Sequence, residues 1–440
     1  MSTARYAEYA RQLSLLAADV RRGAWAPLTD DVHQALNGQA ATKLRALVPR
    51  QVRREHGAFF TAGGARSAFE AMIDSDASSS PSSMWDPSCG AGDLLLAAAR
   101  ALPLASTPTR TIAAWSRLVR GNDLHERFVE VARLRLTLAA LERHRQAGDM
   151  RAVSDVVAHH AFSSVGQGDG LLALDGSRAF EGRILLNPPF GPTSVGAECA
   201  WSSGKTSTAA IFAARAVECL ADGGRLSAIL PDVLRSGSRY ASWRTYLDEK
   251  LLIDSVLPHG LFDEHTDVDV FLLQGRRLQP GEHRKTQWWQ ESASGTTVGE
   301  VFDVRVGSVV DNRDPHEGTY VPFLTARGLP PHGVTGLPER QRHFAGTLLK
   351  PPFVVIRRTS RPGPGPGGGT RGMGVLVTGD ALVAVDNHLI TVRPLDGQEE
   401  TCQELLDCLA RPAVSTWLDE RIRCRHLTVG VVRTIPWQSD

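Results

Sequence analysis

The stretch WDPSCGAGDLL, residues 85–95, joins a short apolar run to the start of a helical pattern through a turn that contains two glycines. Gly90 and Gly92 let the backbone pass close to a bound molecule, because glycine has no Cβ and adopts positive φ at little cost. Asp86 precedes them, and its carboxylate would repel a pyrophosphate but suits a ligand with an ammonium group. The stretch predicts a strand, a binding turn and a helix, without the full dinucleotide fingerprint or the lysine of a triphosphate loop.

The same succession of strand, turn and helix continues through residues 51–279. The strand-like runs are SSMWDP (82–87), LVRGNDL (118–124), RILLNPPF (183–190) and RLSAILP (225–231), and helical patterns such as ERFVEVARLRLTLAALERH (126–144) and TAAIFAARAVECLADGG (208–224) follow them. Strands that alternate with helices predict an α/β fold with a doubly wound, mostly parallel sheet. Ligands of such sheets bind at the carboxyl ends of the strands.

Three of those ends carry polar side chains. Asp123 follows the second strand, where an acid commonly accepts hydrogen bonds from ribose hydroxyls. It could equally be a helix N-cap. Asp169, in GQGDGLL, stands in a third such turn as a partner for an adenine amine or as a plain Asp-Gly turn. After the fourth run Asn187 precedes two prolines and Phe190, and the prolines end the strand abruptly and stiffen the loop after it.

In this order the four motifs resemble those of S-adenosylmethionine-dependent DNA adenine-N6 methyltransferases, whose sheet is Rossmann-like. The resemblance is nearest to type I modification subunits and to methylases fused to a target-recognition domain like that of a specificity subunit. It extends to REHGAFFTAGGARSAFEAMI (54–73), similar to the family's upstream cofactor segment, and to residues 223–277, similar to its last strands. Ala62 departs from the pattern, because the family usually has proline there.

The resemblance implies roles for individual residues. S-adenosyl-L-methionine would be bound by Phe60, Thr61, Asp86, Pro87, Cys89, Gly90, Gly92, Asp123, Asp169 and Asn187. The catalytic segment would be Asn187, Pro188, Pro189 and Phe190. The Asn187 side-chain oxygen and the Pro188 carbonyl would accept the N6 hydrogens of a flipped-out adenine, and Phe190 would stack against the base. Phe262 would supply the opposite stacking face or, equally, be an ordinary core residue.

Two further regions flank this domain. Residues 1–50 contain amphipathic helical patterns, with Tyr6 and Tyr9 on one face, and predict an N-terminal helical extension that packs on the domain. Residues 280–440 combine short β-like runs with Gly- and Pro-rich turns and a helical pattern at 402–422, and predict an α+β domain. Within it, residues 297–440 resemble the target-recognition domains of type I specificity subunits, in stretches such as TVGEVFDVRVGS (297–308) and PPFVVIRR (351–358). This resemblance implies a partner in double-stranded DNA.

One part of the C-terminal region is locally basic. Residues 340–379 contain no acidic residue and seven cations, a pattern that favours phosphate contact or, alternatively, an arginine-rich solvated loop. The seven are Arg340, Arg342, Lys350, Arg357, Arg358, Arg361 and Arg371.

The composition excludes some classes of protein and of site. The net charge is +1 and no apolar run is long enough to span a membrane. Six scattered cysteines without a C-x-x-C pair argue against a zinc site or a disulfide framework and for a reducing, cytoplasmic setting. No nuclease signature stands out, so we expect no cleavage by this chain alone, although restriction or defence-system subunits could be partners.

Several functions remain open at this point. A site-specific DNA adenine methyltransferase of a restriction–modification or phage-defence system leads. Methylation of a protein glutamine or of ribosomal RNA is an alternative, since those enzymes also carry Asn-Pro-Pro and an aromatic residue but usually lack a C-terminal reading domain. A non-catalytic DNA-recognition subunit and N4-cytosine methylation are further alternatives, although the latter usually has serine in place of Asn187.

Overall fold

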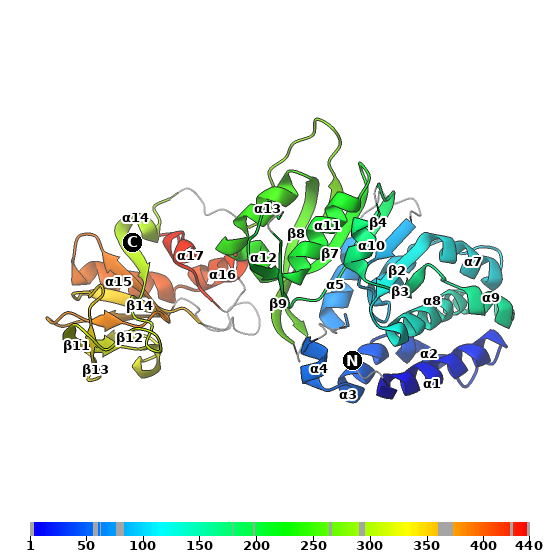
Figure 1. The fold of residues 1–440 in the computed structure, drawn as a ribbon, viewed down its shortest axis with the longest axis horizontal. Coiled ribbons are helices and arrows are strands. Elements are labelled where there is room, and N and C mark those ends of the chain that lie inside the picture. Colours follow the sequence, from blue (N-terminus) through cyan, green and yellow to red (C-terminus); the bar gives the residue numbers. More distant parts are fainter. Residues whose placement is uncertain are drawn as a thin grey trace. The chain divides into compact units, whose positions relative to one another are not determined.

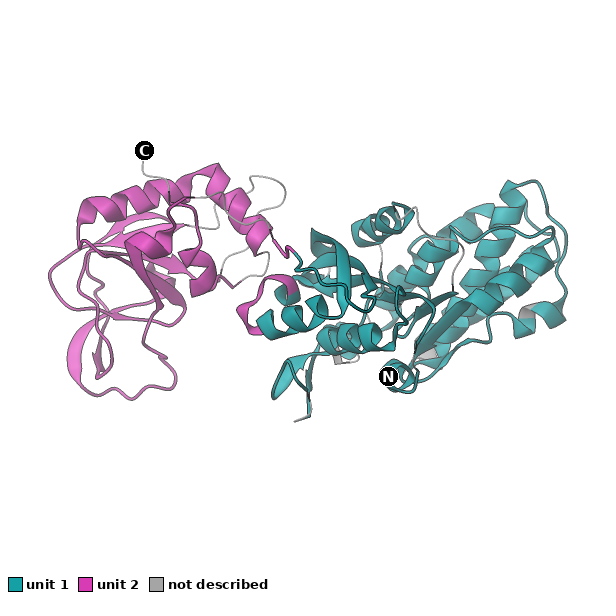
Figure 2. Ribbon diagram, turned by 90° about the horizontal axis from the view of Figure 1, so that it is seen from above, with its two compact units in different colours: residues 1–234, 240–286 teal, residues 235–239, 287–440 magenta. Residues whose placement is uncertain are grey.

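The computed structural model describes the chain in ten segments, and the chain divides into two compact units (Figure 2). Unit 1 comprises Met1–Leu234 and Tyr240–Thr286, and unit 2 comprises Arg235–Arg239 and Gln287–Asp440. The described segments are residues 4–55, 60–61, 63–75, 83–177, 179–196, 199–263, 266–289, 295–359, 373–422 and 426–437.

Unit 1 is built on a seven-stranded sheet with the order β3-β2-β1-β4-β7-β9-β8 (Figure 1). The first five strands in this order run parallel, whereas β9 pairs antiparallel with both β7 and β8. The strand order reverses between β1 and β4, which is where sheets of this kind bind ligands. The strands are β1 Ser83–Asp86, β2 Val119–Asp123, β3 Val165–Gln167, β4 Gly182–Leu186, β7 Arg225–Pro231, β8 Leu251–Asp263 and β9 Thr266–Arg277.

Helices cover the sheet in two groups, and their contacts define the groups. Helix α6 contacts both α5 and α8, and helix α11 contacts both α10 and α13. Strand β4 is buried on both of its faces, as expected for a strand covered by helices on either side. The helices of this unit are α5 Gly63–Asp74, α6 Asp93–Ala99, α7 Pro108–Leu118, α8 Glu126–Gln146, α9 Asp155–His160, α10 Gly170–Asp175, α11 Thr208–Cys219 and α13 Ala241–Asp248, whereas α12 Asp232–Ser236 and η1 Ser238–Tyr240 each contain residues of both units.

These elements confirm the predicted fold class. Each predicted strand is present, and β4 ends at Leu186, directly before Asn187 and the two prolines. A short hairpin of β5 (Pro192–Ser194) and β6 (Lys205–Ser207) separates β4 from α11. None of the helices in the described segments is long and apolar enough to cross a membrane.

Among the described residues, four helices precede α5 within unit 1 (Figure 1). They are α1 Ala4–Arg21, α2 Thr29–Leu36, α3 Gln39–Leu47 and α4 Arg50–Glu55. Both α1 and α2 contact α8, and the predicted apolar face of α1 is buried, with Tyr6 at 0% and Tyr9 at 3% exposure. Their core is continuous with that of the sheet domain.

Unit 2 has an α+β fold, as predicted. A five-stranded sheet has the order β10-β17-β14-β15-β12, and a three-stranded sheet has the order β13-β11-β16. The predicted helix at 402–422 is two helices, because Pro412 starts a new helix at its N1 position. The elements are α14 Val298–Val301, β10 Phe302–Val306, β11 Thr319–Leu324, η2 Ala326–Gly328, β12 Gly333–Thr335, β13 Gln341–Phe344, β14 Phe353–Arg357, β15 Gly374–Val377, β16 Ala384–Val385, β17 Leu389–Pro394, α15 Glu399–Ala410, α16 Pro412–Arg421 and α17 Val429–Arg433.

Candidate active site

A cavity of about 190 Å³ opens where β1, β2, β3 and β4 end. The turns after these strands supply much of its polar lining, and three phenylalanine side chains contribute to its apolar lining. Because four successive strands end here, residues far apart in the sequence meet in one place. The lining residues are Phe60, Pro87, Ser88, Gly90, Asp123, Leu124, His125, Phe128, Gly168, Asp169, Gly170, Leu171, Asn187, Pro189, Thr208 and Phe212.

The glycine turn after β1 shows why glycine is required at two positions. Gly90 has φ +50°, and a Cβ there would lie 2.8 Å from the Phe60 ring, which faces the cavity. Gly92 has φ +84°, and a Cβ there would lie 3.1 Å from the Cβ of Ala132 on α8. Gly90 therefore lets the turn meet the cavity wall, whereas Gly92 lets α6 pack closely on α8. Cys89, a predicted cofactor residue, is buried in the core and is not among the lining residues.

Two carboxylates hold this turn in place. Asp123 Oδ2 accepts a hydrogen bond from the Gly90 backbone N–H at 3.1 Å, and its Oδ1 accepts one from the His125 N–H at 2.8 Å. Asp86 Oδ1 accepts from the Ser88 N–H at 2.9 Å. Burial raises the pKa of Asp86 from 3.8 to about 7, and burial likewise raises the pKa of Asp123 to about 6. A bound cation would favour the ionised form of both groups.

Asp86 should make the stability of the unliganded protein depend on pH. Its raised pKa in the folded state means that its contribution is favourable below about pH 4 and is lost as the pH rises through about 7. Asp86→Asn is therefore expected to stabilise the protein by on the order of 2–3 kcal/mol at pH 8, and by progressively less down to pH 5. Urea unfolding of both proteins at pH 5, 6, 7 and 8 measures this difference; a gain that does not depend on pH would contradict it.

The turn after β3 is fixed by a cap and by a close contact. Asp169 is the N-cap of α10, and its Oδ1 accepts from the Leu171 N–H at 2.8 Å and from the Leu172 N–H at 3.4 Å. Asp169 is also exposed to the cavity, so the local Asp-Gly geometry and a ligand contact are compatible. The next residue, Gly170, would place a Cβ 1.7 Å from the Pro87 carbonyl oxygen. The turns after β1 and β3 thus support each other.

Gly170 offers a direct test of this contact. Gly170→Ala is expected to lower the free energy of unfolding by about 3 kcal/mol, because the new methyl group would collide with backbone rather than with a movable side chain. The matched control is Gly166→Ala in β3, where nothing lies within 4 Å of the added Cβ. Chemical denaturation compares the two; equal losses would show that the turns are not in contact.

Asn187 and Thr61 lie side by side in the structure. Asn187 Nδ2 donates a hydrogen bond to Thr61 Oγ1 at 2.6 Å, and Thr61 is only 2% exposed. This bond joins the end of β4 to the segment before α5, over a separation of 126 residues. With Nδ2 bonded to Thr61, Oδ1 is the end of the amide that remains to accept a hydrogen bond. Ala62, where the sequence departs from the family pattern, and residues 56–59 lie outside the described residues.

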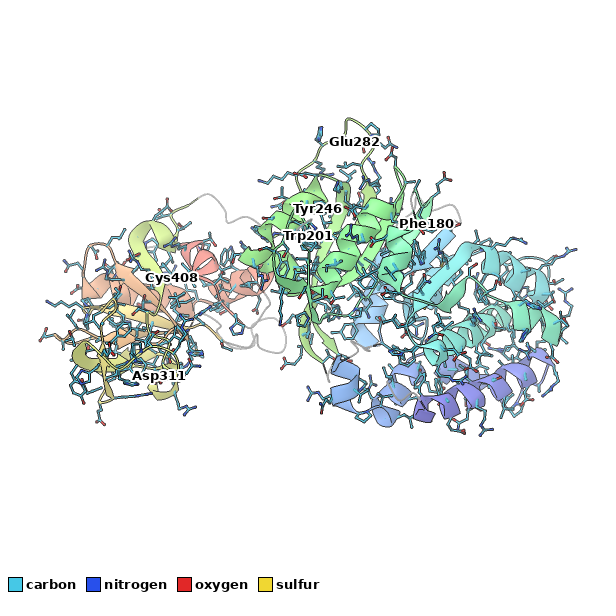
Figure 3. The ribbon with its side chains drawn as sticks, in the orientation of Figure 1. Phe180, Trp201, Tyr246, Glu282, Asp311 and Cys408 are labelled. Carbon is cyan, nitrogen blue, oxygen red and sulfur yellow. The ribbon has the colours of Figure 1, made fainter. Side chains whose placement is uncertain are left out.

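Phe190 lies on a loop that is tied at both ends. The Gly191 carbonyl accepts hydrogen bonds from the Thr208 N–H and Oγ1, each at 2.9 Å. The hairpin after this loop is packed in turn, because Trp201 lies against Tyr246 of α13 at 6.4 Å (Figure 3). The Phe190 and Phe262 rings meet edge to face, with centroids 5.7 Å apart and planes at 86°. Phe262 is only 2% exposed.

The two rings therefore do not form an open slot in this conformation. Faces stacked on opposite sides of one base would be parallel and about 7 Å apart, since each carbon contact needs ~3.5 Å. Phe190 is half-buried and Phe262 supports its edge. The sequence pattern identified both rings but gave no information on their mutual angle.

The structure also brings residues to the cavity that no motif indicated. Phe128 and His125 come from the start of α8, and their rings are 5.1 Å apart. Thr208 and Phe212 come from the first turns of α11. Phe128 could have been suspected, because it lies five residues after Asp123 in a helix that starts at the cavity. For Phe212, an apolar residue in an apolar helix, the sequence offered no such signal.

In unit 2 the predicted basic residues do not form one exposed set. Arg342 is buried, with its side chain 1% exposed, and it pairs with Asp311 at 2.9 Å (Asp311 is labelled in Figure 3). Arg357 donates to the carbonyls of Pro330, at 2.9 Å, and Leu329, at 2.5 Å. These two cations hold the fold of the unit together. The acid-free sequence is not acid-free in space, because Asp311 comes from a segment outside residues 340–379.

The other predicted cations differ in exposure. Lys350 is exposed, and Arg340 is 55% exposed while pairing with Asp311 at 3.0 Å. Arg358 is half-buried and donates to the Asn387 carbonyl at 2.8 Å. Arg361 and Arg371 lie outside the described residues.

Comparisons with known proteins give a family match and several structural similarities. The family model described as N-6 DNA Methylase matches residues 46–294. No curated protein matches significantly. The solved structure of the type IIL restriction-modification enzyme MmeI in complex with DNA is 11% identical, with a TM-score of 0.51, over 91% of this chain and 71% of that one.

Two further solved structures are more distant in shape. The type IIG restriction endonuclease BpuSI is 14% identical, with a TM-score of 0.42, over 90% of this chain and 61% of that one. A modification subunit of a type I restriction enzyme from Vibrio vulnificus YJ016 is 17% identical, with a TM-score of 0.36, over 55% of this chain and 49% of that one. The chain thus spans about three fifths of the first of these proteins and half of the second.

Proposed function

We propose a reaction and a target for this chain, which belongs to the N-6 DNA Methylase family, the adenine-specific DNA methyltransferases of restriction–modification systems. It transfers a methyl group from S-adenosyl-L-methionine to N6 of a flipped-out adenine in double-stranded DNA. The observation that carries the proposal is the bond between Asn187 and Thr61 beside a cavity lined by carboxylates and aromatic rings.

The cavity suits S-adenosylmethionine by its chemistry. Asp123 and Asp169 line it and would accept hydrogen bonds from ribose hydroxyls and an adenine amine, and Phe60 offers an apolar wall. Asp86, two residues from the lining residue Ser88, has a raised pKa that a cationic ligand would offset. Pro87 and Gly90 contribute the turn, whereas Cys89 and Gly92 support it from behind. When bound, the cofactor supplies an electrophilic methyl group on a sulfonium.

The residues after β4 would make the target nitrogen a nucleophile. An exocyclic adenine amine is a poor nucleophile because its lone pair is delocalised into the ring. The Asn187 Oδ1 and the Pro188 carbonyl each accept one N6 hydrogen, which draws the nitrogen towards tetrahedral geometry. Thr61 fixes the amide through its bond to Nδ2, and Pro188 and Pro189 keep the backbone stiff. The chain's contribution is thus preorganised dipoles and positioning.

Phe190 is the proposed stacking surface for the base. Its ring is half-buried and its loop is anchored by Thr208. Phe262 supports Phe190 from the edge, and it would serve as a second stacking face only if the pair opened when the base entered. Flipping itself is required because N6 of a paired adenine is inaccessible inside a duplex.

Unit 2 is the proposed target-recognition domain. The exposed Lys350 and Arg340, the half-buried Arg358, and Arg361 and Arg371 outside the described residues are the proposed phosphate contacts. Arg342 and Arg357 stabilise the unit that presents them. By similarity to the same family, we also propose a cytoplasmic role in restriction–modification or phage defence, with further subunits as partners.

Incubation of the pure chain with labelled S-adenosylmethionine and plasmid DNA tests the proposal. We expect N6-methyladenine at one short sequence, detected by mass spectrometry of nucleosides and by single-molecule sequencing. N4-methylcytosine would point to the alternative base, and label in protein or ribosomal RNA instead of DNA would overturn the proposed substrate. Cofactor binding without any transfer would favour a DNA-recognition subunit.

A further inference from the structure

Helix α1 packs directly behind the wall of the cofactor cavity. Tyr6 of this helix is 0% exposed, and its ring meets Phe128 edge to face at 5.1 Å and Phe60 at 6.2 Å. Phe60 and Phe128 also meet each other, at 4.8 Å, and both line the cavity. Tyr6 therefore completes a three-ring cluster of which two rings face the ligand space.

The three-ring cluster also contacts the glycine turn. A Cβ at Gly90 would lie 2.8 Å from the Phe60 ring, so the ring and the backbone of the turn are already in close contact. Movement of the Phe60 ring towards the cavity would narrow the cavity, and movement in the other direction would remove this part of the cavity wall. Edge-to-face contacts restrict such movement, because each pair is worth about 0.5–1.5 kcal/mol beyond burial.

A second connection joins the N-terminal helices to the same turn. Arg135 of α8 has a fully buried side chain and pairs with Asp93 at 2.8 Å. Its guanidinium also donates to the Ala91 carbonyl at 2.6 Å and to the Ala35 carbonyl near the end of α2 at 2.8 Å. Ala91 lies between the two glycines of the turn. One guanidinium thus fastens α2, α8 and the turn together.

We propose that the N-terminal helices form the outer layer of the cofactor pocket, with Tyr6 as a positioning residue that sets Phe60 and Phe128. The inference rests on the proposed function, since it takes the cavity to be the S-adenosylmethionine site. It assigns the ring of Tyr6, rather than its hydroxyl, to this role. The hydroxyl oxygen is buried and has no hydrogen-bond partner among the described residues, so it contributes no bond that the role requires.

Tyr9 provides a matched control in the same helix. It is 3% exposed, its hydroxyl also lacks a hydrogen-bond partner among the described residues, and its ring meets that of Tyr6 at 5.4 Å. It therefore shares the burial of Tyr6 but is one ring further from the cavity. A purely structural role for α1 predicts the same consequences for both tyrosines, whereas a role in the pocket predicts a difference.

The experiment compares Tyr6→Leu, Tyr9→Leu and Tyr6→Phe in the full chain. Calorimetry gives the dissociation constant for S-adenosylmethionine, and urea unfolding gives the stability without it. Tyr6→Leu is expected to weaken cofactor binding by roughly tenfold, in line with the loss of two ring contacts. Tyr9→Leu and Tyr6→Phe are expected to stay within about threefold of the wild type. If Tyr6→Leu does not fold, Tyr6→Met takes its place.

The outcomes separate the two proposals. If the wild-type chain does not bind S-adenosylmethionine, the proposed function fails, and this inference fails with it. If the wild type binds but the Tyr6 and Tyr9 variants weaken binding equally, or neither does, the inference alone is overturned. If Tyr6→Phe loses affinity as Tyr6→Leu does, the hydroxyl carries the effect and the assignment to the ring is wrong.

Discussion

Asn187→Ala is expected to reduce methyl transfer by about 10³-fold or more, while the dissociation constant of the cofactor changes by less than about tenfold. The substitution removes the Oδ1 acceptor that we assign to the target amine. Removing one preorganised partner of a reacting atom typically costs 10²–10³-fold, and here the same group also defines the position of the base. Transfer of labelled methyl groups to DNA gives the rate, and calorimetry gives cofactor binding.

Two control substitutions separate the acceptor from its support. Asn187→Asp keeps Oδ1 as the acceptor for the target amine, and the Thr61 hydroxyl can donate to the second carboxylate oxygen, which takes the place of Nδ2. Measurable transfer should therefore remain. Thr61→Val removes the partner of Nδ2, which is 2.6 Å away in the wild type, and leaves the amide free to rotate. A loss of about 10–100-fold is expected, smaller than in Asn187→Ala. Transfer at the wild-type rate in Asn187→Ala would remove Asn187 from its assigned role.

The sequence predicted those parts of the site that depend on chain order. Asp86, Asp123, Asp169 and Asn187 each lie at or just after the end of a strand, and parallel strands bring their carboxyl ends to one edge of the sheet. The two prolines after Asn187 marked the end of β4 without reference to anything else in the chain. Local chemistry and strand order together were sufficient for these positions.

The sequence could not predict features that depend on packing between distant segments. Gly170 belongs to an Asp-Gly turn in the sequence, but its lack of a Cβ is required by the Pro87 carbonyl, 83 positions earlier in the chain. The edge-to-face angle between Phe190 and Phe262 depends on how the loop after β4 packs against β8. Tyr6 looked like one apolar position among several in an amphipathic helix, and only the fold places it behind Phe60 and Phe128.

For the basic stretch of unit 2, likewise, the sequence could not predict which charged side chains are exposed. A count along the sequence treats Arg342 and Lys350 as equal, although one is buried and the other exposed. Neutralising partners come from other segments, as Asp311 does for Arg340 and Arg342. Burying a cation costs desolvation free energy that a nearby anion must offset. A buried arginine with such a partner is therefore structural, whereas a phosphate contact has to be exposed.

Arg342→Ala is accordingly expected to destabilise unit 2 by about 1–3 kcal/mol, because it removes a buried, hydrogen-bonded guanidinium, although its partner Asp311 is 38% exposed. Besides its pair with Asp311, the guanidinium donates to the carbonyl of His343 at 3.2 Å and lies 5.0 Å from the centre of the Phe323 ring. The substitution would leave the carboxylate and the carbonyl without this donor. Urea unfolding measures the change, and any loss of DNA affinity should follow from it.

Lys350→Ala is the matched comparison, because Lys350 is exposed in the same 340–379 stretch. Its stability should stay within about 0.5 kcal/mol of the wild type. Its DNA affinity should fall uniformly across sequences, and the slope of log K against log salt should decrease by about 1, as expected for one lost phosphate contact. Fluorescence anisotropy at several salt concentrations gives both quantities. If the Arg342→Ala protein kept full stability and instead had a smaller slope of log K against log salt, Arg342 would be a DNA contact, and the structural role assigned to it would be wrong.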